Sequence, residues 1–136
     1  INNKDYKKIN GNTLVVIQSK NNERFGGFTS NFWESTKNET FKDDKHAFVF
    51  SLNKQKIYNY KNDGKSIRCH KEYGPYFGKG PLIGIRGNPL KEKSLRSFNI
   101  KTSFDVDDQF LSNNYDFAID YLVFKLFLND LNVLYK

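Results

Sequence analysis

The sequence of 136 residues contains one cysteine, no methionine and three prolines. A single cysteine cannot form a disulfide within the chain, which favours a reducing compartment. No run approaches the roughly 20 apolar residues that span a bilayer, and no signal-peptide pattern opens the chain. We therefore expect a cytoplasmic protein with no membrane span.

Arginine is also sparse, although the chain is basic overall, with a net charge of +7 and a pI of about 9.4. The arginines are Arg24, Arg68, Arg86 and Arg96, scattered along the chain. Nucleic-acid readers usually concentrate Arg and Lys on one element. The remaining positive charge is lysine, and asparagine is abundant too, as in a chain with biased codon usage. A basic nucleic-acid-binding module stays an alternative, and we consider it the weaker one.

Aromatic residues are plentiful, with 13 Phe and 8 Tyr. Rings and β-branched side chains suit strands, so the composition favours β structure. The length is that of one domain, residues 1–136, and allows a real core. The chain opens at Ile1 rather than at methionine, and we expect it to be a piece of a longer protein.

The segment Ala47–Leu52 predicts the central strand of the fold. In an extended chain, large side chains fall on one side and small or β-branched ones on the other. The large ones are Phe48, Phe50 and Leu52, and the small ones are Ala47, Val49 and Ser51. This pattern is typical of a strand buried on both faces, with its small side packed against a second layer.

The segment Phe25–Ser30 places Gly26 and Gly27 between Phe25 and Phe28. Glycine weakens a strand unless backbone or a ring must approach closely there. We expect this segment and Ala47–Leu52 to face each other across the core.

The rest of the chain reads as further short strands joined by turns, which indicates a β-sandwich. Strands are predicted over Thr13–Ser19, Phe25–Thr29, Ile57–Tyr60, Ser66–His70, Leu82–Ile85 and Tyr115–Phe127. Phe32 and Trp33 are expected to close one end of the core. Loops are predicted over Glu34–Lys45 and Gly74–Pro81, a loop or helical turn over Asn88–Ser97, and a turn at Ser112–Asn114. The segment Leu128–Lys136 is expected to form a short helix with Leu131 and Leu134 on one side.

Three motifs resemble a phosphate-binding, a calcium-binding and a thiol-based site. For each of them we favour a purely structural role. Gly74–Gly80 resembles a phosphate loop, but Pro81 and a strand follow it where a P-loop has Gly-Lys-Ser/Thr and a helix. Asp105–Asp108 resembles the start of a calcium loop but lacks that loop's later glycine and glutamate. Cys69 and His70 are neighbours in a strand, so their side chains point to opposite faces. We expect Cys69 to be a buried small residue, and a thiol-dependent detoxifying enzyme using Cys69 stays an alternative.

Five segments in order resemble the TLDc domain family. They are Val16–Ser19, Phe25–Thr29 with Trp33, Asp44 before Ala47–Leu52, Gly74-Pro75-x-Phe77-Gly78-x-Gly80, and Phe117-x-Ile119-Asp120-x-x-Val123-Phe124. The resemblance runs from about Thr13 to Leu126.

The resemblance implies a mainly β fold: a sandwich of two antiparallel sheets with short flanking helices. Its core would be residues 13–127, and residues 1–12 would be the remnant of an upstream helical segment. It also implies a link to oxidative-stress resistance and binding to the vacuolar proton-pumping ATPase, at the surface of acidic organelles. Established catalytic residues, metals and cofactors do not come with the family, so we expect a non-catalytic interaction module.

The signature positions are expected to be architectural. Gly26 and Gly27 would admit a facing ring, and Phe77 would anchor its loop. The full set is Phe25, Gly26, Gly27, Phe28, Trp33, Ala47, Phe48, Phe50, Ser51, Leu52, Gly74, Pro75, Phe77, Gly78, Gly80, Phe117, Val123 and Phe124.

Overall fold

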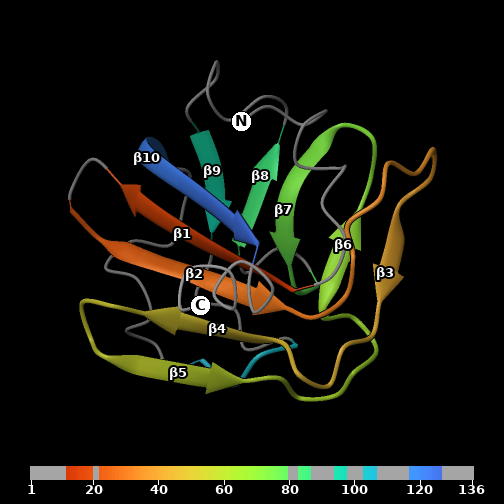
Figure 1. The fold of residues 1–136 in the computed structure, drawn as a ribbon, viewed down its shortest axis with the longest axis horizontal. Helices are drawn as coiled ribbons and strands as arrows, with labels where there is room; N and C mark the ends of the chain where they lie inside the picture. Colours follow the sequence, from red (N-terminus) through yellow and green to blue (C-terminus); the bar gives the residue numbers. More distant parts are fainter. Residues whose placement is uncertain are drawn as a thin grey trace, which may run out of the picture.

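The computed structural model describes residues 12–19, 22–79, 83–86, 94–97, 103–106 and 117–126. Within them lie ten β-strands (Figure 1). The strands are β1 (Thr13–Ser19), β2 (Arg24–Thr29), β3 (Thr40–Lys42), β4 (Phe48–Ser51), β5 (Lys56–Asn59), β6 (Ile67–Cys69), β7 (Tyr73–Phe77), β8 (Ile83–Arg86), β9 (Ser94–Ser97) and β10 (Phe117–Leu126).

The strands form two antiparallel layers that share one strand. The order is β3-β6-β7-β8-β9-β10-β1-β2-β4-β5. β10 belongs to both layers, because Phe117 and Ala118 pair with β9 while Ile119 to Leu126 pair with β1. This confirms a mainly β fold of two antiparallel sheets. The flanking helices are not confirmed, since the described residues contain no helix.

Most of the predicted strands are present at or near their expected positions. β1 has the predicted bounds, and β2, β5, β6, β8 and β10 lie inside or within a residue of theirs. The expected turn at Ser112–Asn114, the expected helix at Leu128–Lys136 and residues 1–11 lie outside the described residues.

The prediction that Gly74–Pro81 forms an irregular loop is wrong at its start. Tyr73–Phe77 is strand β7, which pairs with β8 through Tyr73↔Arg86 and Tyr76↔Gly84. The register shifts between these two pairs, so β7 carries an extra residue there. A bulge of this kind accommodates Pro75, because a residue outside the regular ladder needs no N–H.

Two other predicted loops also contain strands. The polar segment Glu34–Lys45 includes β3, which pairs with β6, and Asn88–Ser97 includes β9, which pairs with β8. Both strands are short and have polar sequences, so neither shows the alternation of apolar residues on which a strand prediction depends.

The expectation that β2 and β4 face each other across the core is wrong, because they are hydrogen-bonded neighbours in one sheet. β4 is also not central, since only β5 lies beyond it. The predicted division of its two faces holds within β4, but the expected burial on both faces fails at Leu52, which follows the strand and is 49% exposed. Val49 belongs to the core and Ser51 is buried, while Phe48 and Phe50 occupy the opposite face.

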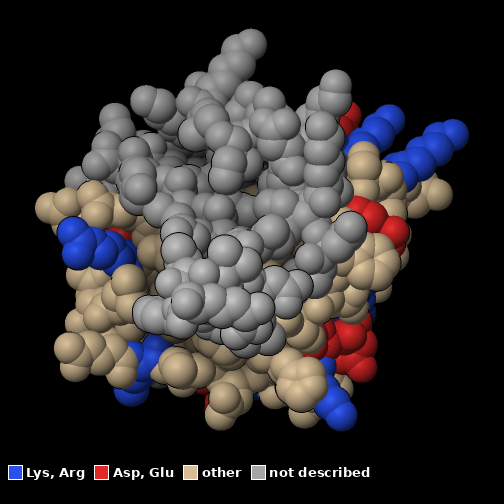
Figure 2. All heavy atoms as spheres, viewed as in Figure 1, with Lys and Arg blue, Asp and Glu red and all other residues tan. Residues whose placement is uncertain are grey.

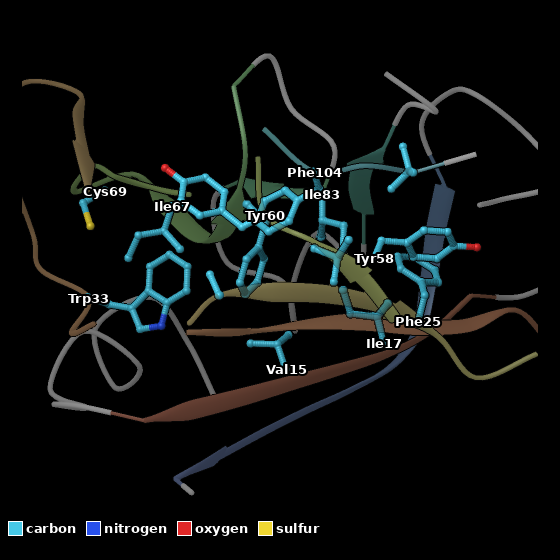
Figure 3. Packing of buried hydrophobic residues seen from close by; sticks show 14 residues of the cluster. Val15, Ile17, Phe25, Trp33, Tyr58, Tyr60, Ile67, Cys69, Ile83 and Phe104 are labelled. Atoms are coloured by element: carbon cyan, nitrogen blue, oxygen red, sulfur yellow. The ribbon is translucent and has the colours of Figure 1, made fainter. Parts of the chain in front are cut away.

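The core lies between the two layers (Figure 3). One layer contributes Val15, Ile17, Phe25 and Tyr58, and the other contributes Ile67 and Ile83. Trp33 and Phe104 fill the space between them from connecting segments. Among the described residues, none belongs to a helix long and apolar enough to pass through a bilayer.

Candidate functional site

A glycine and a ring interlock the two layers at the centre of the molecule. A Cβ added to Gly27 of β2 would lie 2.7 Å from Cζ of Phe77, at the end of β7, and 2.8 Å from both Cε atoms. Real Cβ atoms do not approach carbon this closely, so only glycine fits under this ring. The side chain of Phe77 is fully buried, which explains how it anchors the end of β7.

Gly26 makes the matching close approach on the other side of β2. A Cβ there would collide with the carbonyl oxygen of Val15 and lie 2.9 Å from Cζ of Phe50. Gly26 and Phe50 are directly opposite in the β2–β4 pairing, so the Phe50 ring covers the glycine on the outer face of the sheet. The two glycines therefore admit two different rings, one in the core and one outside it.

Trp33 closes one end of the core, as the sequence predicts, but Phe32 does not. The indole is buried, donates Nε1–H to Thr13 Oγ1 at 3.0 Å, and meets the Phe77 ring edge-on. Phe32 is 44% exposed. The Lys42 ammonium lies 3.3 Å from the centre of its ring and also pairs with Glu34.

Asp44 is a buried carboxylate that holds the segment after β2 in place. Its oxygens accept hydrogen bonds from both the hydroxyl and the amide of Ser30 (2.7 and 2.6 Å) and from the Thr29 hydroxyl (2.7 Å). The amides of His46 and Asn31 also donate to it, at 3.0 and 3.3 Å. A carboxylate that receives so many donors at a buried position has a structural role.

Burial by itself would raise the pKa of Asp44. The hydrogen bonds from Thr29, Ser30 and His46 act in the opposite direction and outweigh it, so the pKa of Asp44 lies below its usual value. Asp44 is therefore ionised at neutral pH, and this excludes it as a proton donor there.

Cys69 is fully buried in β6, among the residues of the core. His70 Nδ1 accepts the Glu72 amide at 3.1 Å, outside the core, while His46 is exposed. In the described part of the chain, no group of three His, Cys, Asp or Glu side chains could hold a metal ion. Asp105 is exposed and Val106 is buried, while Asp107 and Asp108 lie outside the described residues.

The basic side chains of the described residues are dispersed. On the face in Figure 2, Lys and Arg lie at separate places near the outline, with acidic side chains close to several of them. Arg68 lies between the rings of Phe41 and Tyr76, 4.8 Å from each, and pairs with Glu39. On the face that Figure 2 shows, the described residues do not form a concentrated basic patch of the kind typical of nucleic-acid-binding proteins.

Part of the outer face of β1, β2, β4 and β5 is apolar. Phe28 and Phe48 stack with their ring centres 5.1 Å apart, and Phe50 lies beside Phe48 at 6.4 Å. At the end of this face, Leu52 is 49% exposed and Ile57 64%. A groove of about 370 Å³ runs here, lined by Leu14, Phe48, Phe50, Ser51, Leu52, Gln55, Lys56 and Ile57. An apolar groove bordered by two exposed aliphatic side chains is a candidate interaction site.

The remaining signature positions are distributed over the fold. Gly74 and Pro75 are in β7, Gly78 follows it with φ of 82°, and Ala47 is buried just before β4. Phe117 pairs with Leu95, while Val123 and Phe124 pair with Val16 and Val15 of β1. Gly80 lies outside the described residues.

Sequence reasoning missed Leu14 and Ile57 as surface residues. Leu14 alternates with buried Val15 along β1, and this alternation is the signal that places it on the outer face. Sequence reasoning also missed the contacts of Asp44. An acidic residue shortly before a buried strand gives no sign of its five donors, which come from segments on either side of it.

The comparisons with known proteins agree with the fold. The model of the TLDc domain matches residues 3–123 of the 136. The comparison with curated proteins returned no match. The family match covers most of the chain, and it coincides with two antiparallel sheets joined by the Gly27–Phe77 contact. This chain belongs to the TLDc domain family.

Proposed function

We propose that this chain is a non-catalytic interaction module that binds subunits of the vacuolar proton-pumping ATPase and contributes to oxidative-stress resistance indirectly. It would act in the cytoplasm, at the surface of acidic organelles, through its partner. Membership of the TLDc family supports the type of module. The pump and the stress response are inferences from that family.

The observation that carries the proposal is the exposed apolar end of the outer face. Leu52 and Ile57 remain largely accessible although they border a groove lined by Phe48 and Phe50. Burying such side chains against a partner is favourable by about 25 cal/mol for each Å² of apolar surface removed from water. Lys54 and Lys56 flank them, so a partner surface with an apolar centre and acidic surroundings would fit.

The burial of Cys69 favours an indirect role in stress resistance over direct reaction of the thiol with oxidants. A thiol reacts with peroxide as an exposed thiolate of low pKa, and Cys69 has no exposed surface.

Binding of purified pump subunits to the immobilised chain tests the proposal. Ile57→Asp should reduce binding strongly, because it places a charge in the apolar contact. Asn38→Asp, which adds the same charge in the exposed segment before β3, should leave binding unchanged. Equal binding by both variants would show that the outer face is not the contact. If the unmodified chain bound no subunit, the pump would be the wrong partner.

A further inference from the structure

We infer that the apolar groove continues into a carboxylate-binding pocket at Arg24, and that the two together bind an extended protein segment with Asp or Glu two positions from an apolar residue. This site rests on the proposed role of the chain as an interaction module, and not on the pump as the partner. Arg24 would be the residue that selects the acidic side chain.

The pocket lies between the start of β2 and the turn that joins β4 to β5, which come together at one edge of their layer (Figure 1). Its volume is about 150 Å³, and Asn22, Arg24, Leu52 and Asn53 line it. Asn53 joins the two segments, because its Oδ1 accepts the Arg24 amide at 2.6 Å and its Nδ2 donates to the Asn22 carbonyl at 3.2 Å. These bonds form the walls of the pocket before any partner binds, which lowers the cost of binding.

Arg24 brings a positive charge to this pocket. The residue is exposed, and its Nε donates to Gln18 Oε1 at 2.8 Å, which holds the guanidinium along the outer face of the sheet. Among the described residues, no acidic side chain forms an ion pair with Arg24. A guanidinium held through Nε still has its two Nη groups to donate, and arginine binds carboxylates through such paired hydrogen bonds. The pocket therefore favours an acidic ligand group.

The pocket and the apolar groove belong to one surface, since Leu52 lines both. The strand pairings put Gly26, Phe50 and Ile57 in one row across β2, β4 and β5. Arg24 lies two residues along β2 from this row, on the same face as Gly26, and its carbonyl accepts the Leu52 amide.

The spacing of these two parts sets the spacing in the ligand. Two residues along a strand cover roughly 7 Å, and side chains two positions apart in an extended peptide lie on one face at the same separation. An apolar side chain that packs against Phe50 and Ile57 would therefore place a carboxylate two positions away at Arg24.

A displayed library of random nine-residue peptides, selected on the immobilised full chain, tests this site. The selected peptides should carry Asp or Glu two positions from an apolar residue. Changing that acid to its amide should weaken binding about tenfold, because a hydrogen bond to a charged group is lost. The difference should shrink at high salt, which screens exposed charges. Selected peptides without this pair, equal binding of the acid and the amide, or no selected peptide at all would overturn the inference.

Variants of the chain assign the preference to its residue, once a melting curve has shown that each is folded. Arg24→Gln should bind the acid and the amide equally, whereas Arg24→Lys, which keeps the charge without the planar fork, should retain part of the preference. Lys37→Gln removes the same charge from the exposed segment before β3 and should leave the preference unchanged. A preference that survives in Arg24→Gln would overturn the role of Arg24.

The two proposals fail in different ways. Pump subunits that bind through Ile57, together with peptides that show no preference for an acid, would reject the pocket and keep the proposed function. A preference for acidic peptides without any binding of pump subunits would keep the pocket and reject the pump.

Discussion

The ring of Phe77 lies so close to Gly27 that a Cβ on that glycine would be 2.7 Å from Cζ. The two residues come from different layers of the fold, and their contact sets how closely β2 and β7 approach each other. The glycine is required by its neighbour and not by a turn, which explains why it occurs in the middle of a strand.

We predict that Gly27→Ala lowers the free energy of unfolding by about 1–3 kcal/mol, because the added methyl group forces the ring to move in a packed core. Gly27→Leu should destabilise the domain further. Denaturant titration measures both changes. Combining Gly27→Ala with Phe77→Leu should reduce the penalty of the alanine, since the ring that it meets is gone. If the losses of unfolding free energy caused by the two substitutions simply added, the alanine penalty would not arise from its contact with the Phe77 ring.

Because of Asp44, the free energy of unfolding of the domain should fall at acidic pH. Its folded-state pKa is lowered, because hydrogen bonds from Thr29, Ser30 and His46 outweigh the effect of burial. Its contribution is therefore complete above the unfolded pKa of about 3.9 and is lost as the pH falls through the lower folded value. We predict that Asp44→Asn lowers the free energy of unfolding at pH 7 by about 2–4 kcal/mol, and that this difference shrinks below about pH 4.

Unfolding titrations at several pH values measure this effect. Asp105→Asn, at an exposed position, is the matched control and should leave the pH dependence nearly unchanged. A constant difference between Asp44→Asn and the unmodified chain from pH 7 to pH 3 would contradict the role assigned to the carboxylate.

Trp33 is the only tryptophan in the chain, so its fluorescence reports directly on the end of the core that it closes. We predict that Thr13→Val costs about 1–3 kcal/mol, because it removes the acceptor of the buried indole N–H while preserving shape. Thr40→Val is the control, since its hydroxyl bond to Asn38 is exposed, and it should cost about 0.5 kcal/mol or less. Unfolding followed by Trp33 emission compares the two.

The thiol of Cys69 is expected to be unreactive in the folded chain. Ellman's reagent should modify it only in denaturant, and the folded chain should consume no peroxide. Cys69→Ala should remain folded, at a cost of about 1–2 kcal/mol for the small cavity, and should protect cells as well as the unmodified chain. Loss of protection by a stable Cys69→Ala variant would revive the thiol-enzyme alternative.

The sequence predicted the strands whose apolar residues alternate or run together, and it failed where other interactions stabilise a strand. β3 and β9 have polar sequences, so their pairing with β6 and β8 depends on neighbours that a local pattern does not reveal. Pro75 argued against a strand at β7, yet the bulge removes the need for its missing N–H. Contacts with neighbouring strands therefore stabilise β3, β7 and β9, and a local sequence pattern does not contain those contacts.

The architectural role of the glycines was predictable, but the identity of their partners was not. Two glycines inside a strand indicate a close approach, and the structure places Phe77 on Gly27 and Phe50 on Gly26. Alternation along a strand shows that two residues lie on opposite faces, but it does not show which other segment covers each face. A ring from the adjacent strand and a ring from the opposite layer are therefore equally compatible with the sequence. For the same reason β2 and β4 were expected to face each other when they are neighbours.

The position of β10 has a consequence for biosynthesis. Thr13, the first residue of β1, finds its partner Leu126 only after more than a hundred intervening residues have been made. Until then β1 and β9 each present an unpaired edge to other nascent chains, a state in which β-rich polypeptides aggregate. Such distant pairing also slows folding. β10 therefore completes both layers, and a chaperone that shields the two edges until β10 pairs should raise the yield of this domain more than that of a protein built from local hairpins.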